Sequence, residues 1–184
     1  MTETATTLAR LIEVMEAGLY SDIVLNADCD FETYSGFVVG VGADYVALKE
    51  VYDMRLEGTR IFSIAIIEDC VFGSETKRGQ QAILASIGIE QPTCPGWLSL
   101  DDPKSCLASI ASNQNWMAVH DGQGCDIGQV VSVAQDKFRL KAVRASGEWF
   151  DEIFEISYDD VTHLNIGGHY GEVYRRYMER ETLT

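Results

Sequence analysis

The chain has 184 residues, of which 46% are hydrophobic, so it is long and apolar enough to bury a core. Its 14 Lys and Arg stand against 29 Asp and Glu, which gives a formal net charge of −15 at pH 7. This charge argues against a protein that binds nucleic-acid backbones or anionic lipid, because both surfaces attract basic residues. We therefore expect no membrane association and regard nucleic acid as an unfavourable partner.

The sequence also bears on cellular location. No apolar run reaches the roughly 20 residues that a membrane-spanning helix needs, and the opening MTETATTLAR lacks the basic start and apolar core of a signal peptide. The five Cys are an odd number without a Cys-x-x-Cys pair, which is typical of reduced thiols. We expect a cytoplasmic protein without a disulfide framework and without a cofactor.

The first half of the chain shows alternating patterns with glycine bends, framed by helical periodicity. Its predicted elements, in chain order, are a helix over 7–18, strands within 35–51, a loop over 53–59, strands over 61–66 and 69–72, and a helix over 77–87. Two prolines and the end of the helical period mark a boundary near 88–96.

The second half shows the same series of patterns. Its predicted elements are a helix that begins around Pro103, strands within 128–143, a loop over 145–151, strands over 153–158 and 161–166, and a helix over 170–180. The segment 99–103, Ser-Leu-Asp-Asp-Pro, supplies a helix cap and a proline in the first turn.

The two series indicate an internal repeat. Segments 35–51 and 127–143 align without a gap at a spacing of 92 residues, and the same spacing continues beyond them. The eleven identities are Gly36/Gly128, Val38/Val130, Val39/Val131, Val41/Val133, Asp44/Asp136, Leu48/Leu140, Lys49/Lys141, Val51/Val143, Ile61/Ile153, Phe62/Phe154 and Ile64/Ile156. We predict a duplicated unit of helix, barrel and helix, with one copy in residues 1–90 and the other in 97–184.

The predicted fold class is α+β, with two tandem small, strongly bent antiparallel β-barrels that each have flanking helices. The residues expected to be mainly buried are Val39, Val41, Leu48, Ile61, Val131, Val133, Leu140 and Ile153.

Each strand pair resembles the Sm-like (SH3-type) small barrel. The similarity rests on the run Gly-x-Val-Val-x-Val, a turn, and Asp-x-Val/Phe-x-Leu at 36–48 and 128–140, together with the leading helix. Sm-like RNA binders usually place an Asn soon after the turn Asp and an Arg-Gly pair in a later loop. Here Tyr45 and Val46 follow the Asp of the first copy, Lys137 and Phe138 follow that of the second, and the later loop has no Arg-Gly. The resemblance therefore implies the barrel without the RNA pocket.

The candidate chemical groups are few. The three histidines, His120, His163 and His169, have no spacing that completes a metal-ligand set, so we interpret them as surface or turn residues. Cys125 lies near His120, yet its position at a strand entrance favours a packing role over a nucleophilic one. We predict no catalytic residues and no metal site, and we expect a protein that is not an enzyme.

The distribution of charge is more informative. Segments 11–48 and 145–174 contain no Lys or Arg. Their acidic residues are Glu13, Glu16, Asp22, Asp28, Asp30, Glu32 and Asp44, and then Glu148, Asp151, Glu152, Glu155, Asp159, Asp160 and Glu172. Such stretches serve either solubility or the attraction of a basic partner.

One loop combines this acidity with a large aromatic residue. We predict that Glu148, Trp149, Asp151 and Glu152 contact a partner, although Trp149 has the alternative of folding back onto its own barrel. In overall character the chain resembles immunity proteins. The favoured hypothesis is thus a non-enzymatic protein-binding module that neutralises a basic partner, such as the toxin domain of a nuclease. The alternatives are an Sm-like regulatory or scaffold protein, with RNA as an associated molecule, and an undetected enzyme.

Overall fold

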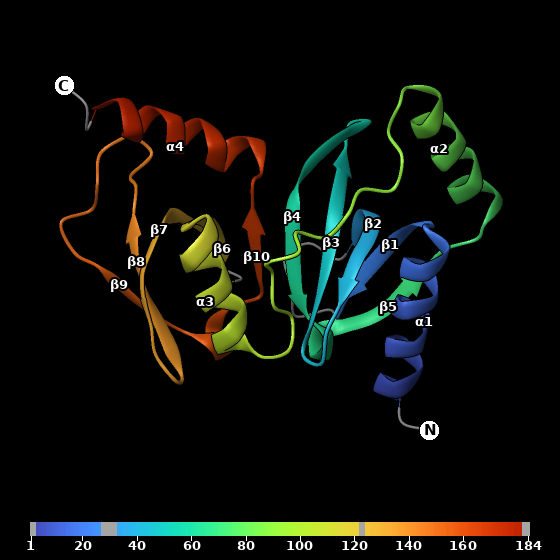
Figure 1. The fold of residues 1–184 in the computed structure, drawn as a ribbon, viewed down its shortest axis with the longest axis horizontal. Helices are drawn as coiled ribbons and strands as arrows, with labels where there is room; N and C mark the ends of the chain where they lie inside the picture. The colour runs from blue at the N-terminus through green and yellow to red at the C-terminus, as the bar shows by residue number, and fades with distance from the viewer. Residues whose placement is uncertain (1–2, 27–32, 122–123, 182–184) are drawn as a thin grey trace.

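The computed structural model describes residues 3–26, 33–121 and 124–181. The first half contains α1 (Glu3–Ala17), β1 (Tyr20–Leu25), β2 (Thr33–Val41), β3 (Tyr45–Tyr52), β4 (Arg55–Ser63), a 3-10 turn (Ile64–Ile66), β5 (Ile67–Val71) and α2 (Glu75–Ser86). The second half contains α3 (Pro103–Asn113), β6 (Trp116–His120), β7 (Cys125–Val133), β8 (Lys137–Ala142), β9 (Phe154–Ser157), a 3-10 turn (Tyr158–Asp160), β10 (His163–Ile166) and α4 (His169–Glu181) (Figure 1). The α+β class and the four predicted helices are confirmed.

Local chemistry explains where the helices begin. Ser74 accepts a hydrogen bond from the backbone N–H of Lys77 and so caps α2. Asp102 caps α3 in the same way through the N–H of Ser105, at 2.9 Å, and Pro103 occupies the first turn. Within the described residues, no helix is long and apolar enough to cross a membrane.

The ten strands form one open antiparallel sheet in the order β5-β1-β2-β3-β4-β10-β6-β7-β8-β9. The prediction of two tandem barrels is not confirmed, because the sheet is open and continues from one half into the other. Residues Thr59–Phe62 of β4 pair with His163–Ile166 of β10, a contact that we call the seam (Figure 1). The seam supplies hydrogen-bond partners to two strand edges that would otherwise be unpaired.

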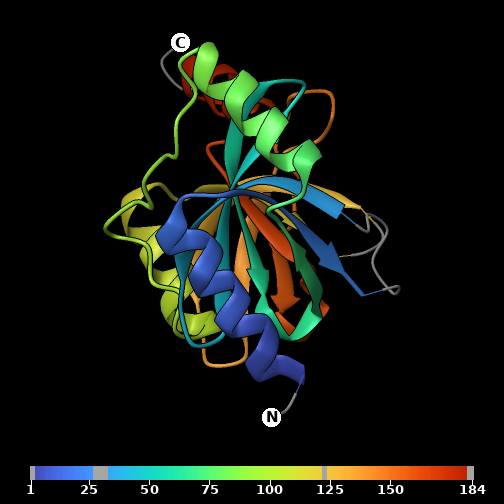
Figure 2. The ribbon, with the colours of Figure 1, turned by 90° about the vertical axis from the view of Figure 1, so that its right-hand side faces the viewer.

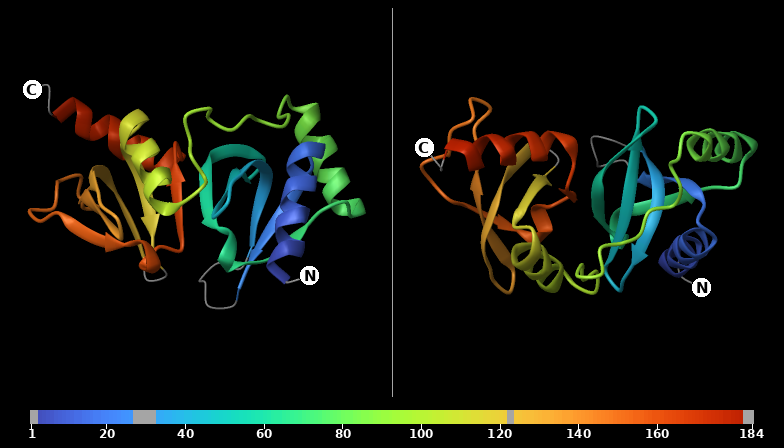
Figure 3. Two further views of the ribbon diagram at one scale, coloured as in Figure 1. Left: turned by 60° about the horizontal axis from the view of Figure 1, so that its bottom comes forward. Right: turned by 45° about the horizontal axis from the view of Figure 1, so that its top comes forward.

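The two halves lie side by side along the sheet. Helices α1 and α2 lie at the outer end of the first half, and α1 crosses its strands (Figure 2). The connection from α2 to α3 runs over the first half before it reaches the second (Figure 3). Leu100 of this connection accepts backbone hydrogen bonds from Asp44 and Tyr45, which fastens it to the β2–β3 turn.

The halves repeat one pairing register at the spacing of 92 residues. Gly36 pairs with Glu50 and Gly128 with Ala142, and both strands skip one residue at the same place, a β-bulge at Val39 and at Val131. A Cβ atom on either glycine would lie 2.2 or 2.1 Å from a backbone carbonyl oxygen, so each position requires glycine.

The predicted equivalence of Phe62 and Phe154 is wrong. Phe62 pairs with Val46, whereas Phe138, the counterpart of Val46, pairs with Ile156. The shift arises in the loops. In the first half β3 and β4 join through a two-residue turn at Asp53 and Met54, so β4 begins earlier than the predicted loop over 53–59 allowed. The second half has a longer connection, which moves the register of β9 by two residues.

The main core extends across both halves. Its largest cluster includes Phe37 and Ile61 from the first half, and Phe138 and Leu140 from the second. A second cluster under α1 centres on Leu11, Val14, Ile23, Leu48 and Phe62, and a small third cluster joins Met178 of α4 to Trp116, Ile127 and Val143. Burial of Val39, Leu48, Ile61 and Leu140 is confirmed, while Val41 and Val133 are half-buried.

Two predicted core residues are exposed instead. Val131 is 51% exposed and Ile153 is 47% exposed. Val39, the counterpart of Val131, shares a core cluster with Leu100 of the connecting segment, and no described segment covers Val131 in that way. Ile153 precedes β9 because of the register shift, which leaves Glu155 in the place that Ile61 occupies in the first half.

Candidate binding sites

The four predicted partner-contact residues lie in the connection between β8 and β9. Glu148, Asp151 and Glu152 are exposed, and Trp149 is half-buried. The Trp149 ring packs against Trp116, with ring centroids 5.6 Å apart. Trp149 therefore folds back in part onto its own half, and only its remaining surface is open to a partner.

The connection is held in a defined shape. Gly147 adopts a positive φ of 82°, and the backbone N–H of Arg144 donates to the carbonyl oxygen of Glu148 at 2.7 Å. The Arg144 guanidinium donates to the carbonyl oxygen of Trp149 at 3.1 Å and to Asp151 Oδ2 at 2.9 Å. The exposed carboxylates thus project from an ordered platform.

Along β9 and the connections at its two ends, acidic side chains outnumber their basic partners. Glu155 binds Lys137 at 2.5 Å and Arg139 at 3.0 Å. Four exposed acidic residues form no ion pair with any described residue: Glu148, Glu152, Asp159 and Asp160. Together with Asp151 and Glu155 they make up what we call the β9 acidic surface. Its field is only partly cancelled within the chain.

The other base-free stretch, 11–48, presents a weaker face. Glu13, Glu16 and Asp44 are exposed. Asp22 instead forms an ion pair with Lys77 of α2, and the Lys77 side chain is only 10% exposed. The remaining predicted acids, Asp28, Asp30 and Glu32, lie outside the described residues.

A second candidate site is a cavity of about 460 Å³ where the two halves meet, which we call the seam cavity. Its polar lining comes from both halves and includes Glu50, Glu57, Arg60, His120, Asn165 and Glu172. A volume of this size falls in the range of small-ligand sites. Sequence reasoning did not predict it, because its walls meet only when β4 pairs with β10.

Arg60 forms the polar centre of this cavity. Its Nε donates to Glu50 Oε2 at 2.6 Å, and its Nη1 lies 2.7 Å from His163 Nε2. Its guanidinium carbon lies 4.6 Å from the ring centroid of Tyr34. The guanidinium only donates, so Nε2 of His163 is the acceptor and the ring proton is on Nδ1, which faces Thr162 Oγ1 at 3.4 Å. Arg60 is thus held by a carboxylate, an imidazole and an aromatic face.

The structure corrects the interpretation of His120 and His163 as surface or turn residues. His163 is 5% exposed, and its ring stacks on His120 with centroids 3.9 Å apart. Burial, the neighbouring His120 and Arg60 lower the pKa of His163 from 6.5 to about 2. Burial and Arg60 lower the pKa of His120 to about 4. Both rings are therefore neutral at pH 7.

This arrangement predicts an acid sensitivity that depends on His163. Below about pH 6.5 the unfolded chain binds a proton at this histidine and the folded protein does not, so stability falls as the pH falls toward the folded pKa. In urea unfolding, the native protein should lose about 2 kcal/mol more between pH 7 and pH 5 than a His163→Phe variant. Ile153→Ala, at an exposed position beside the edge strand β9, should keep the native pH dependence. Equal pH profiles for the native protein and His163→Phe would contradict the assignment.

The mouth of the seam cavity carries aromatic and acidic side chains. Tyr52 is 70% exposed and Tyr170 is 62% exposed. Glu57 Oε2 accepts a hydrogen bond of 3.1 Å from the backbone N–H of His169, which satisfies the first turn of α4. Glu172 follows on the same helix.

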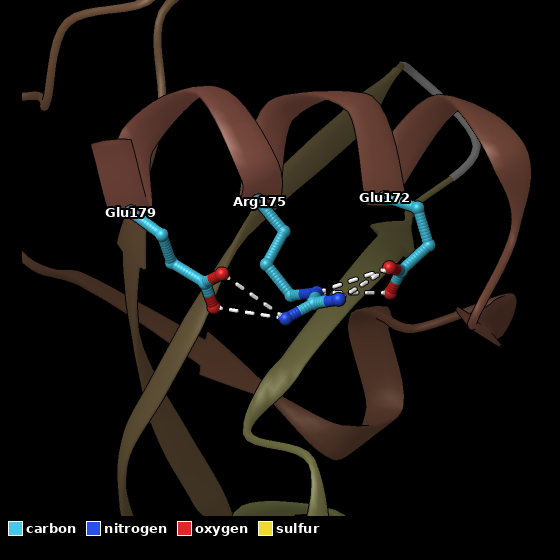
Figure 4. Close-up of polar contacts among 3 residues, drawn as sticks. All are labelled: Glu172, Arg175 and Glu179. Atoms are coloured by element: carbon cyan, nitrogen blue, oxygen red, sulfur yellow. Dashed lines mark hydrogen bonds and ion pairs between the residues drawn. The ribbon is translucent and has the colours of Figure 1, made fainter. Parts of the chain in front are cut away.

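Glu172 is positioned by a chain of ion pairs along α4. Arg175 lies between Glu172 and Glu179, and all three side chains extend from one face of the helix (Figure 4). Arg175 Nη2 lies 2.7 Å from Glu172 Oε2, and Nη1 lies 2.9 Å from Glu179 Oε1. Glu172 is thereby kept in a fixed place at the cavity wall.

The remaining groups considered in the sequence are Cys125 and the possible metal ligands. Cys125 begins β7 as expected, and it is exposed rather than packed. Among the described residues, no three His, Cys, Asp or Glu side chains gather in a way that would hold a metal ion. Comparison of the chain with protein-family models, with curated proteins and with solved structures finds no match in any of the three.

Proposed function

We propose that this chain is a non-enzymatic binding protein that neutralises a basic protein partner, in the manner of an immunity protein or antitoxin that blocks a nuclease toxin. The β9 acidic surface carries the proposal, because its exposed carboxylates exceed the cations available to them within the described chain. A nuclease holds a phosphate backbone with Lys and Arg, so its active face is cationic. An acidic protein that covers this face competes with the nucleic acid.

The shape of the surface supports this role. Arg144 holds the backbone of the β8–β9 connection, so the carboxylates need little ordering when a partner arrives. Half-buried Trp149 adds apolar area next to them, which is the usual composition of an interface anchor. The negative field that remains after these ion pairs would accelerate the encounter with a cationic protein.

A second candidate function is an Sm-like regulatory or scaffold protein that associates with RNA. The repeated strand register and the joining of the two halves through the seam favour it. The net charge of −15 weighs against it, because RNA binding releases counterions only where cations meet phosphates.

The test is co-expression with the product of the adjacent reading frame, followed by calorimetry of the purified pair. We expect a complex, inhibition of nuclease activity and protection of growth. No complex with that product would contradict the proposed function. Salt-sensitive binding of a single-stranded RNA oligonucleotide in the same calorimeter would favour the second candidate instead.

Charge reversal on the β9 acidic surface should act mainly on association. We expect the double variant Glu148→Lys/Glu152→Lys to bind the partner about tenfold or more slowly at low salt, with a smaller salt dependence, because exposed charges steer encounter. Its stability should change by less than about 0.5 kcal/mol, since neither residue is buried.

The matched control is Glu13→Lys/Glu16→Lys, which reverses two exposed charges on α1. It should bind nearly as fast as the native protein in stopped-flow measurements. If the α1 variant is slowed and the β9 variant is not, the interface lies on the face of α1.

A further inference from the structure

We propose that the seam cavity is a socket for one cationic side chain, an Arg or Lys, of the basic partner. The inference rests on the proposed function, which supplies a partner rich in such side chains. It adds a specific contact point, separate from the β9 acidic surface, and it assigns a role to the junction of the two halves.

The charge of the lining favours a cation. Three carboxylates line the cavity, from Glu50, Glu57 and Glu172, against the single guanidinium of Arg60. The Arg60 charge is already balanced by Glu50 at 2.6 Å. Glu172 is shared with Arg175. Glu57, in contrast, accepts the backbone N–H of His169 and forms no ion pair within the described residues, with Lys49 near enough to interact with it electrostatically. Glu57 is therefore the carboxylate whose charge is least compensated.

The aromatic walls favour the same ligand. The chain holds its own Arg60 by combining a carboxylate with the face of Tyr34. The lining contains the same kinds of group at its mouth, where Glu57 and Glu172 occur together with the exposed rings of Tyr52 and Tyr170. A cation over an aromatic face gains electrostatic energy that grows as water is excluded.

Two buried polar atoms of the lining have no hydrogen-bond partner among the described residues. They are the indole Nε1 of Trp116, a residue 4% exposed, and Oδ1 of Asn165. Buried polar atoms are usually paired, so two such atoms in residues of one cavity wall indicate that the groups of the described chain do not satisfy this wall completely. A guanidinium supplies hydrogen-bond donors for an acceptor such as Oδ1 of Asn165.

An anion is the competing occupant, because α4 begins at the cavity and Arg60 is cationic. However, the N–H of His169 at the start of α4 already donates to Glu57, and Arg60 already donates to Glu50 and His163. An anion would also meet three carboxylates. The observations therefore favour the cation.

The direct test is an NMR titration of the whole protein with N-acetyl-arginine amide. We expect saturable shifts of the Trp116 indole N–H and of the Asn165 side-chain amide. The citrulline analogue, which has a similar shape without the charge, should bind at least about tenfold more weakly. Equal binding of the two probes, or saturable shifts with inorganic phosphate instead, would overturn the proposal.

Substitutions in the cavity lining test which side chains contribute to binding of the arginine probe. Glu57→Gln keeps an acceptor for the N–H of His169, removes the charge and should weaken arginine binding about tenfold. Tyr52→Ala should weaken it as well. The matched controls are Glu13→Gln and Tyr177→Ala, exposed positions outside the lining, which should bind the probe as the native protein does. Identical affinities for Glu57→Gln and Glu13→Gln would exclude the socket.

The complex with the partner separates the two proposals. If native protein and Glu57→Gln bind the partner equally well, the proposed function stands and the socket is wrong. If the arginine probe binds as expected and no basic partner forms a complex, the cation site stands and the proposed function fails. A loss of about tenfold in partner affinity for Glu57→Gln, with none for Glu13→Gln on α1, supports both.

Discussion

Phe62→Ala should lower the free energy of unfolding by about 3–5 kcal/mol, the usual cost of truncating a buried aromatic residue. Phe62 is 0% exposed in β4, and its ring centroid lies 5.0 Å from that of Tyr34 and 5.4 Å from that of His163 across the seam. The deletion therefore removes contacts within the first half and between the halves. Little relaxation can refill the space, because strands hold both sides.

The measurement is urea unfolding followed by circular dichroism. Ile153→Ala is the control, since Ile153 is 47% exposed and its truncation should cost less than about 0.5 kcal/mol. Equal effects of the two truncations would contradict the burial assigned to Phe62, and with it the packing of the seam.

Removing Glu50 alone should destabilise the protein by about 3 kcal/mol or more, because it leaves the Arg60 guanidinium buried without its carboxylate. The two side chains are only 10% and 17% exposed, so solvent cannot replace the lost partner well. We therefore expect Glu50→Leu to be one of the most damaging single changes at the seam cavity.

The double variant Glu50→Leu/Arg60→Met should be more stable than Glu50→Leu, because no buried charge remains. A double-mutant cycle in urea measures this coupling directly. If the effects of the two single changes simply add, Arg60 does not depend on Glu50, and the charge balance assigned to the seam cavity is wrong.

The sequence by itself determined the local elements and their repetition. Short local patterns predicted two of the helices, and the structure confirms both. The cap and the proline indicated the start of α3, and the apolar spacing indicated α1. The identities Gly36/Gly128 and Lys49/Lys141 also predicted that the two strand pairs are equivalent, and the pairing of β2 with β3 matches that of β7 with β8 at these positions. The acidic character of the β8–β9 connection is likewise visible in the sequence alone.

Only the tertiary structure decided how the halves join and what the junction contains. Arg60 and His163 are 103 positions apart, and neither a period nor a motif connects them before β4 pairs with β10. The same pairing joins the strands of the two halves into one sheet and gathers the walls of the seam cavity. Burial was also decided by tertiary contacts. Val39 and Val131 occupy equivalent bulges, but Leu100 of the connecting segment shares a core cluster with Val39, while Val131 is exposed. Strand pairing and coverage depend on contacts between distant segments, so identical local sequence does not determine them.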